Sequence, residues 1–180
     1  MKKKTIHMPL DRKDILFLKA GEQVFLSGVI YTARDQAHLR MANMIKEGKG
    51  LPLSLERETI YYAGPTPSHG GKIGSCGPTT SSRMDVFTPA LLKKGLKGMI
   101  GKGKRSKVVR DAIKSSGAVY FVAPAGAGAY LSTKIKSMEP VAFEDLGPEA
   151  IYRLTVEDFP VIVAIDARGG DIYERLSEGK

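Results

Sequence analysis

Residues 96–123, LKGMIGKGKRSKVVRDAIKSSGAVYFVA, carry the clearest structural pattern in the chain. The apolar stretches at 96–100 and 118–123 predict two strands. Between them, residues 106–115 have apolar side chains at helical spacing and are followed by Gly117, so they predict a helix that ends there. A strand, a helix and a second strand in this order predict a βαβ unit with parallel strands.

The same alternation extends in both directions from this unit. Strands are expected near the start of the chain and at 23–31, 59–63, 151–156 and 161–166, and helices at 35–46, 81–94 and 127–135. Strands at both ends of the chain, outside the βαβ units, predict a mixed sheet. We therefore expect one α/β domain over residues 1–180, with βαβ units and a mixed sheet.

Composition and charge exclude several classes of protein. The 180 residues are 42% hydrophobic and 26% charged, which is typical of a globular domain rather than a disordered chain. No apolar run approaches the roughly 20 residues of a membrane span. The 28 Lys and Arg outnumber the 19 Asp and Glu, and this excess attracts anions. The densest basic stretch, residues 102–105, contains no aromatic residue, so we do not expect a nucleic-acid-binding surface.

Cysteine and histidine usage limits the metal chemistry. Cys76 is the single cysteine, and His7, His38 and His69 show no metal-ligand spacing. This chain alone is therefore not expected to hold a disulfide, a structural zinc or an iron–sulfur cluster. A single cysteine also fits a reducing compartment, so we expect a cytoplasmic protein.

The first candidate site motif is TARDQAH, residues 32–38. Thr32 stands three residues before Asp35, which predicts a capping arrangement at the start of a helix. Arg34 and His38 are four residues apart and so share one helix face. Arg34 can hold a carboxylate through two parallel hydrogen bonds, and His38 can exchange a proton near neutral pH. The alternative is a surface arginine beside a structural histidine.

The second motif is GPTTSSR, residues 77–83. It delivers the hydroxyls of Thr79 and Thr80 to a predicted helix start, where free backbone N–H groups and the helix dipole favour an anion. Arg83 lies one turn further on and can face the same anion. The alternative is an ordinary helix cap.

The third motif is IGKGKR, residues 100–105, which follows a predicted strand. Glycines on both sides of Lys102 allow a close backbone approach, and ligands of α/β sheets bind at the carboxyl ends of strands. The spacing differs from that of a phosphate-binding Walker loop. A solvated basic turn is the alternative. Together the three motifs suit a small dianion such as a dicarboxylic acid, and the electrophile for its chemistry must come from elsewhere.

These motifs, with residues 121–126 and 161–166, resemble the β subunit, or C-terminal domain, of class I fumarase and L(+)-tartrate dehydratase. The likeness runs from about residue 11 to residue 171, and the string GPTTSSRMD at 77–85 is its most specific part. The resemblance implies a swivelling β/β/α domain in an iron–sulfur hydro-lyase. In that family a separate α subunit or N-terminal domain binds a four-iron four-sulfur cluster through three cysteines.

The resemblance also assigns roles to residues. His38 matches the active-site histidine of the family, and the positions that contact substrate are matched by Arg34, Thr79, Thr80, Arg83 and Lys102. His38 and the Thr79 hydroxyl are the two candidates for the base. The implied function is that of the β subunit of an iron–sulfur fumarate hydratase, which hydrates fumarate reversibly to (S)-malate and acts only in a hetero-oligomer with its α partner. The β subunit of L(+)-tartrate dehydratase is the alternative, and a non-catalytic dicarboxylate-binding module is a more distant one.

Overall fold

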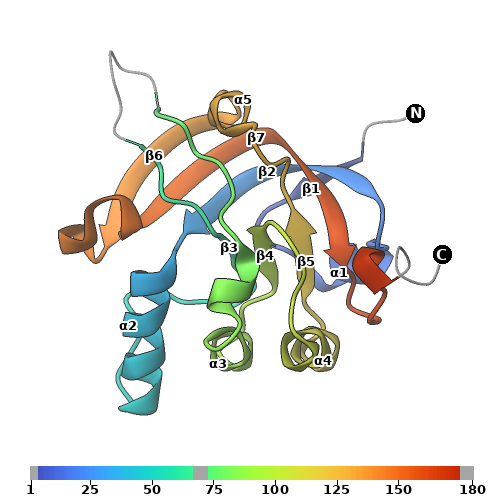
Figure 1. Ribbon diagram of the computed structural model, residues 1–180, viewed down its shortest axis with the longest axis horizontal. Helices are drawn as coiled ribbons and strands as arrows, with labels where there is room; N and C mark the ends of the chain where they lie inside the picture. Colours follow the sequence, from blue (N-terminus) through green and yellow to red (C-terminus); the bar gives the residue numbers. More distant parts are fainter. Residues whose placement is uncertain (1–3, 67–72, 175–180) are drawn as a thin grey trace.

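Figure 1 shows the computed structural model, which describes residues 4–66 and 73–174; His69 lies outside these ranges. The elements alternate between strands and helices along the chain, and two of the helices, η1 and η2, are short 3₁₀ helices. In chain order they are β1 (Thr5–His7), α1 (Arg12–Phe17), β2 (Gln23–Thr32), α2 (Asp35–Lys46), β3 (Thr59–Tyr61), η1 (Ser81–Met84), α3 (Thr88–Lys93), β4 (Gly98–Gly101), α4 (Lys107–Ser116), β5 (Val119–Val122), α5 (Gly128–Ser132), β6 (Ile135–Ala142), η2 (Glu144–Glu149) and β7 (Ile151–Ile165).

Five of the strands close into a barrel. β2, β3, β4 and β5 pair side by side in parallel. β7 then pairs antiparallel with β5 on one side and with β2 on the other, which completes the ring. β1 extends β2 in parallel and β6 extends β7 antiparallel. The mixed sheet and the three βαβ connections through α2, α3 and α4 confirm the predicted α/β architecture.

The parallel strands are covered on both faces, which explains their nearly continuous apolar sequence. Successive strand residues point to opposite faces. Ile100 and Phe121 belong to a core shared by the strands, whereas Met99 and Tyr120 belong to a second core under the helices. α2, α3 and α4 lie side by side over this second core (Figure 1). Within the described ranges, no helix is long and apolar enough to cross a membrane.

The single helix predicted at 81–94 is wrong. The structure has the one-turn helix η1, a turn, and then the separate helix α3. Pro89 stands in the first turn of α3, a position where its missing N–H costs nothing, but a helix running through from residue 81 would lose a hydrogen bond there and clash with the ring. The proline therefore starts a helix instead of continuing one.

The two strands predicted at 151–156 and 161–166 are one continuous strand, β7. The polar residues between them do not break it, because β7 carries one extra residue there, opposite the stretch of β2 from Leu26 to Gly28. The Ser27 hydroxyl accepts a hydrogen bond from the Asp158 amide at 3.1 Å. Strand β6 and helix α1 were not predicted. The helix predicted at 127–135 is confirmed only over Gly128–Ser132.

Candidate functional site

The candidate residues lie along the edge of the barrel where the parallel strands end. Arg34 is two residues beyond β2, and Lys102 follows β4 directly. The segment that carries Thr79 and Thr80 lies beside this end of β4, because Thr80 forms a parallel bridge with Lys102. The Ser81 amide donates to the Lys102 carbonyl at 2.9 Å, and the Lys102 amide donates to the Thr79 carbonyl at 3.2 Å. The fold thus brings together motifs that are far apart in sequence.

Two candidate arginines share one carboxylate at the start of α2. Nε of Arg83 donates to Oδ1 of Asp35 at 2.9 Å, and Nε of Arg34 lies 4.0 Å from the other oxygen, Oδ2. Nε of Arg34 also lies 3.9 Å from Oε1 of Glu149 at the end of η2. Nε of Arg34, Oδ2 of Asp35 and Oε1 of Glu149 are buried atoms without a hydrogen-bond partner. Both Arg34 distances are too long for hydrogen bonds, so this guanidinium is held loosely by two acids.

The side chain of Arg34 also lies against the backbone of Gly64, just beyond β3. A Cβ atom at Gly64 would come within 2.9 Å of Nη1 of Arg34 and within 3.1 Å of the Pro148 carbonyl oxygen. A glycine at this position therefore leaves the room that the guanidinium occupies.

His38 is completely buried one turn into α2. Its Nδ1 lies 2.8 Å from the Arg34 carbonyl oxygen, and its ring packs against Tyr62 and Phe87. A carbonyl can only accept, so Nδ1 carries the proton, and Nε2 is left as a buried acceptor with no partner. Burial lowers the pKa of His38 from 6.5 to about 4, so the imidazole is neutral at physiological pH.

The predicted cap at Thr32 is wrong. Thr32 is the last residue of β2, and its hydroxyl accepts a hydrogen bond from the Tyr152 amide at 3.1 Å. Arg34 is the residue at the helix start, and it makes no side-chain cap. The Thr32 hydroxyl thus bonds to the backbone of β7, which lies beside this end of β2, and does not cap α2.

The helix predicted to begin after Thr79 and Thr80 does begin at Ser81, with Thr80 as its N-cap residue, but it does not provide the free amides that the motif predicted. η1 is a single 3₁₀ turn, and the amides of Thr79 and Ser81 already donate to the carbonyls of Tyr62 and Lys102. The Thr79 hydroxyl donates to the Tyr62 carbonyl as well, at 2.7 Å. These residues therefore offer an anion their hydroxyl oxygens and neighbouring cations, but not a row of free helical amides.

A cavity of about 520 Å³ lies beyond the ends of β4 and β5. Thr80 and Lys102 line it, together with Gly103 and residues that follow β5. Arg34, His38, Thr79 and Arg83 are not among its lining residues. The structure therefore places the candidates in two adjoining groups, the arginines around Asp35 and the Thr80–Lys102 pair, joined by the segment 79–83.

A buried network around Arg105, which was not predicted from the sequence, fixes this segment. The Arg105 side chain is fully buried, and its Nε donates to Oδ1 of Asp85 at 2.6 Å. Its Nη2 donates to the Thr88 hydroxyl at 2.8 Å, and its guanidinium packs over the Tyr62 and Tyr120 rings. Asp85 ends the string 77–85, and Arg105 follows the third motif, so the two partners of this pair come from separate motifs.

The residues of this chain do not fit an iron–sulfur cluster. Burial raises the pKa of the Cys76 thiol to about 12, which disfavours the thiolate that a cluster needs. Within residues 4–66 and 73–174, no three His, Cys, Asp or Glu side chains are grouped so as to hold a metal ion.

The hydro-lyase class, which the sequence motifs resemble, is also the class of the relatives that match this mixed α/β barrel. The chain belongs to the fumarase C-terminus family, whose model matches residues 1–176.

Three relatives illustrate the range of this family. A Methanocaldococcus jannaschii protein named "Putative L(+)-tartrate dehydratase subunit beta" is 39% identical over 94% of this chain and 90% of its own length. Fumarate hydratase 2 of Leishmania major is 36% identical over 96% of this chain, which spans 31% of that protein. The aerobic class I fumarate hydratase of Escherichia coli is 40% identical over 84% of this chain, which spans 28% of that protein. The chain thus spans nearly all of the Methanocaldococcus jannaschii protein but only about a third of the two fumarate hydratases.

Proposed function

We propose that this chain is the β subunit of an iron–sulfur-dependent fumarate hydratase, which hydrates fumarate reversibly to (S)-malate. The observation that carries the proposal is the gathering of Arg34, Arg83, Thr79, Thr80 and Lys102 along one edge of the barrel. Relatives of this family are hydro-lyases, and the motifs along this edge are those that resemble the family's substrate-contacting positions.

The active enzyme is proposed to be a cytoplasmic hetero-oligomer. This chain matches about a third of each single-chain fumarate hydratase, and a relative of nearly its own length is named a β subunit. The rest of the enzyme, including the four-iron four-sulfur cluster, is then an α subunit. Residues 1–180 form one domain that swivels against that partner. When bound, the partner's cluster supplies the Lewis acid that this chain lacks.

The residues of this chain bind and orient the substrate. The two carboxylates of the substrate are bound by the guanidinium groups of Arg34 and Arg83 and by the ammonium of Lys102. The hydroxyls of Thr79 and Thr80 orient the carbon chain between the carboxylates. Holding both carboxylates fixes the carbon–hydrogen bond that must break in the dehydration direction. Such positioning lowers the activation free energy, because proton transfer from substrate to base becomes a step within one complex.

Of the two candidate bases, burial favours Thr79. His38 is fully enclosed and its Nδ1 proton is donated to the Arg34 carbonyl, so we propose that it orients the start of α2. The Thr79 hydroxyl is only partly buried, and its residue neighbours Thr80 of the Thr80–Lys102 pair. A hydroxyl needs a proton acceptor beside it to act as a base, and the α subunit is proposed to supply one.

The test is the rate of a single turnover in enzyme reconstituted with its α subunit. Thr79→Val is expected to abolish turnover of (S)-malate, Thr79→Ser to retain much of it, and His38→Gln to reduce it only partly. Loss of turnover in His38→Gln with full turnover in Thr79→Val would reverse the assignment. Full activity of the isolated chain without iron would overturn the proposed function.

L(+)-tartrate dehydratase is the second candidate, favoured by the name and length of the Methanocaldococcus jannaschii relative. Its substrate carries one more hydroxyl than malate, and the chemistry is otherwise the same. Comparing kcat/KM for fumarate and L-tartrate in the reconstituted complex decides between the two.

A further inference from the structure

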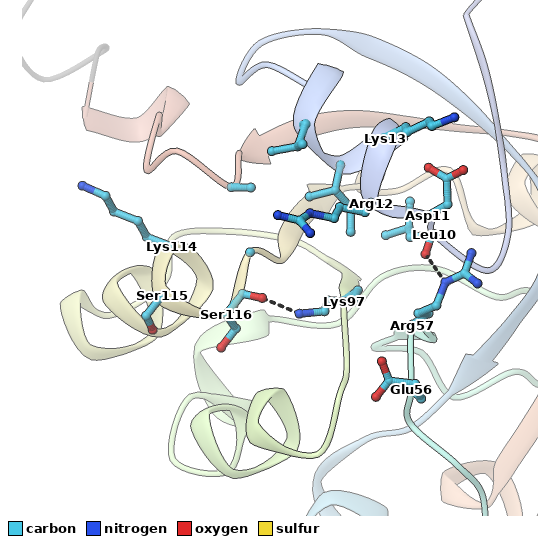
Figure 2. Close-up of a pocket in the computed structure, with 14 residues that line it drawn as sticks. Leu10, Asp11, Arg12, Lys13, Glu56, Arg57, Lys97, Lys114, Ser115 and Ser116 are labelled. Atoms are coloured by element: carbon cyan, nitrogen blue, oxygen red, sulfur yellow. Dashed lines mark hydrogen bonds between the residues drawn. The ribbon is translucent and has the colours of Figure 1, made fainter.

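A second cavity, of about 880 Å³, lies on the opposite edge of the barrel. It is formed where β3, β4 and β5 begin, between α1, the segment at Glu56 and Arg57, Lys97 and the C-terminal end of α4 (Figure 2). None of the candidate substrate residues lines it. Its volume is within the range of small-molecule sites, roughly 300–1,000 Å³.

The arginines of the described chain separate into two groups by their partners. Each arginine in residues 4–66 and 73–174 forms an ion pair with a carboxylate, except Arg12, Arg57 and Arg168. Arg12 and Arg57 line this cavity, and Arg168 follows the lining residue Ala167 and donates to the carbonyl of another lining residue, Leu16, at 3.0 Å. Within the described residues, the three arginines that form no ion pair therefore all lie at or beside this cavity.

Two of the cations at this cavity, Arg57 and Lys97, donate hydrogen bonds to backbone carbonyls. Nε of Arg57 donates to the Leu10 carbonyl at 3.0 Å, and the residue has a left-handed backbone with φ 65°. That conformation is unusual for a residue other than glycine and is often retained where a side chain has a task. The Lys97 ammonium donates to the Ser116 carbonyl and thereby offsets the negative end of α4. Figure 2 shows the Lys97 ammonium directed at Ser116 and the Arg12 guanidinium extending away from Lys13.

The lining contains fewer acids than bases. Its five basic residues, Arg12, Lys13, Arg57, Lys97 and Lys114, stand against Asp11 and Glu56. Asp11 already caps α1, where its Oδ1 accepts from the Asp14 amide at 2.7 Å. Beneath these charges the wall includes the buried side chains of Leu10 and Ile15. An apolar wall limits solvent screening and strengthens attraction of an anion.

We propose that this cavity binds a small anion that carries two or more phosphate groups. Guanidinium forks match phosphate oxygens in pairs, and an excess of five basic over two acidic residues around one cavity favours a multivalent anion over a single carboxylate. The cavity lies at the edge opposite the proposed fumarate site, and the inference does not depend on that function.

Inorganic pyrophosphate is the probe, titrated calorimetrically into the full chain at low salt. We expect saturable binding to one site in a chain that also carries Arg83→Gln, since that variant weakens the opposite edge. The double variant Arg12→Gln/Arg57→Gln should weaken binding by about tenfold or more, because each guanidinium contributes charge-assisted hydrogen bonds. Arg153→Gln, which removes the same charge from an ion pair on β7, should leave the affinity unchanged.

Two further measurements keep the result interpretable. Arg12→Lys/Arg57→Lys retains the charge and should bind more tightly than the glutamine variant, and thermal unfolding followed by circular dichroism should show that each variant folds. Backbone amide NMR shifts caused by pyrophosphate should map to residues 10–16, 56–57 and 114–117. Absence of saturable binding, equal weakening in Arg153→Gln, or shifts confined to residues near Lys102 would overturn the proposal.

Discussion

Asp35 accepts a hydrogen bond from Nε of Arg83 at 2.9 Å, although the two residues are 48 positions apart in sequence. The other oxygen of the same carboxylate is 4.0 Å from Nε of Arg34. One acid therefore sets the separation of two guanidinium groups that we propose hold the two ends of a dicarboxylate. A displacement of Arg34 or Arg83 is therefore expected to alter the position of the other arginine through Asp35.

Asp35→Asn is expected to lower kcat/KM for fumarate about tenfold, mainly through a higher KM, because Arg83 loses the negative charge of its partner and keeps only a hydrogen bond to a neutral acceptor. Steady-state kinetics of the reconstituted enzyme measure this. Asp145→Asn is the matched control, since it removes a carboxylate paired with Arg40 of the same helix, α2. Equal effects of the two substitutions would argue against a positioning role for Asp35.

Gly64→Ala is expected to raise KM several-fold by displacing Arg34. The added methyl group would come within 2.9 Å of Nη1 and 3.0 Å of Cδ of that side chain, so the guanidinium must move. Gly50→Ala is the control, because nothing lies within 4 Å of a Cβ atom there. An unchanged KM in Gly64→Ala, with normal folding, would show that substrate does not depend on this position of Arg34.

His38 should make the protein less stable as the pH falls from 6.5 toward 4. Burial lowers the pKa of His38 to about 4, so between pH 6.5 and 4 this histidine is protonated in the unfolded chain but stays neutral in the folded chain. Relative to pH 7.5, wild type at pH 4.5 should lose about 2.5 kcal/mol more unfolding free energy than His38→Gln. Urea unfolding of both proteins at the two pH values measures this difference.

The same titration can be observed directly by NMR. The His38 ring resonances of folded protein should stay constant from pH 8 down to pH 5. His7→Gln, which alters an exposed histidine, is the control for the unfolding experiment. A folded-state midpoint near 6.5 for His38 would contradict the buried, neutral imidazole.

Arg105→Gln should destabilise the fold by about 3–5 kcal/mol, because it leaves the Asp85 carboxylate without the charge it faces. Urea unfolding measures the loss. Lys107→Gln, which breaks the exposed pair with Asp111 one turn along α4, should leave the unfolding free energy nearly unchanged. Similar losses in the two variants would mean that the Arg105 network is not structural.

Strong periodic patterns made part of this fold predictable from sequence. The helix expected at 35–46 has those bounds because its buried residues, Ala37 and Met41, recur at helical spacing. Strand β6 escaped prediction because its side chains are mostly exposed and do not alternate, so only pairing with β7 makes it a strand. The helix expected at 81–94 failed at Pro89, whose backbone constraint outweighs the pattern of apolar residues around it.

The candidate site was predictable where strand ends determine it. Arg34 and Lys102 follow β2 and β4, and parallel strands bring their carboxyl ends to one edge. The role of Asp35 between two arginines was not visible, because its partner Arg83 comes from a different segment. Arg105 resembles any solvated arginine in a basic turn, and only the packed structure shows it buried against Asp85 and two tyrosines.

The closure of the barrel by β7 has a consequence for synthesis of the chain. β2 is synthesised early. Its residues from Gln23 to Tyr31 pair with β7, which is synthesised more than a hundred residues later. During translation this edge of β2 is exposed to other nascent chains, and contacts of such long sequence separation form slowly. Expression at low temperature or with a holdase chaperone should therefore raise the yield of native protein more than stabilising the helices would.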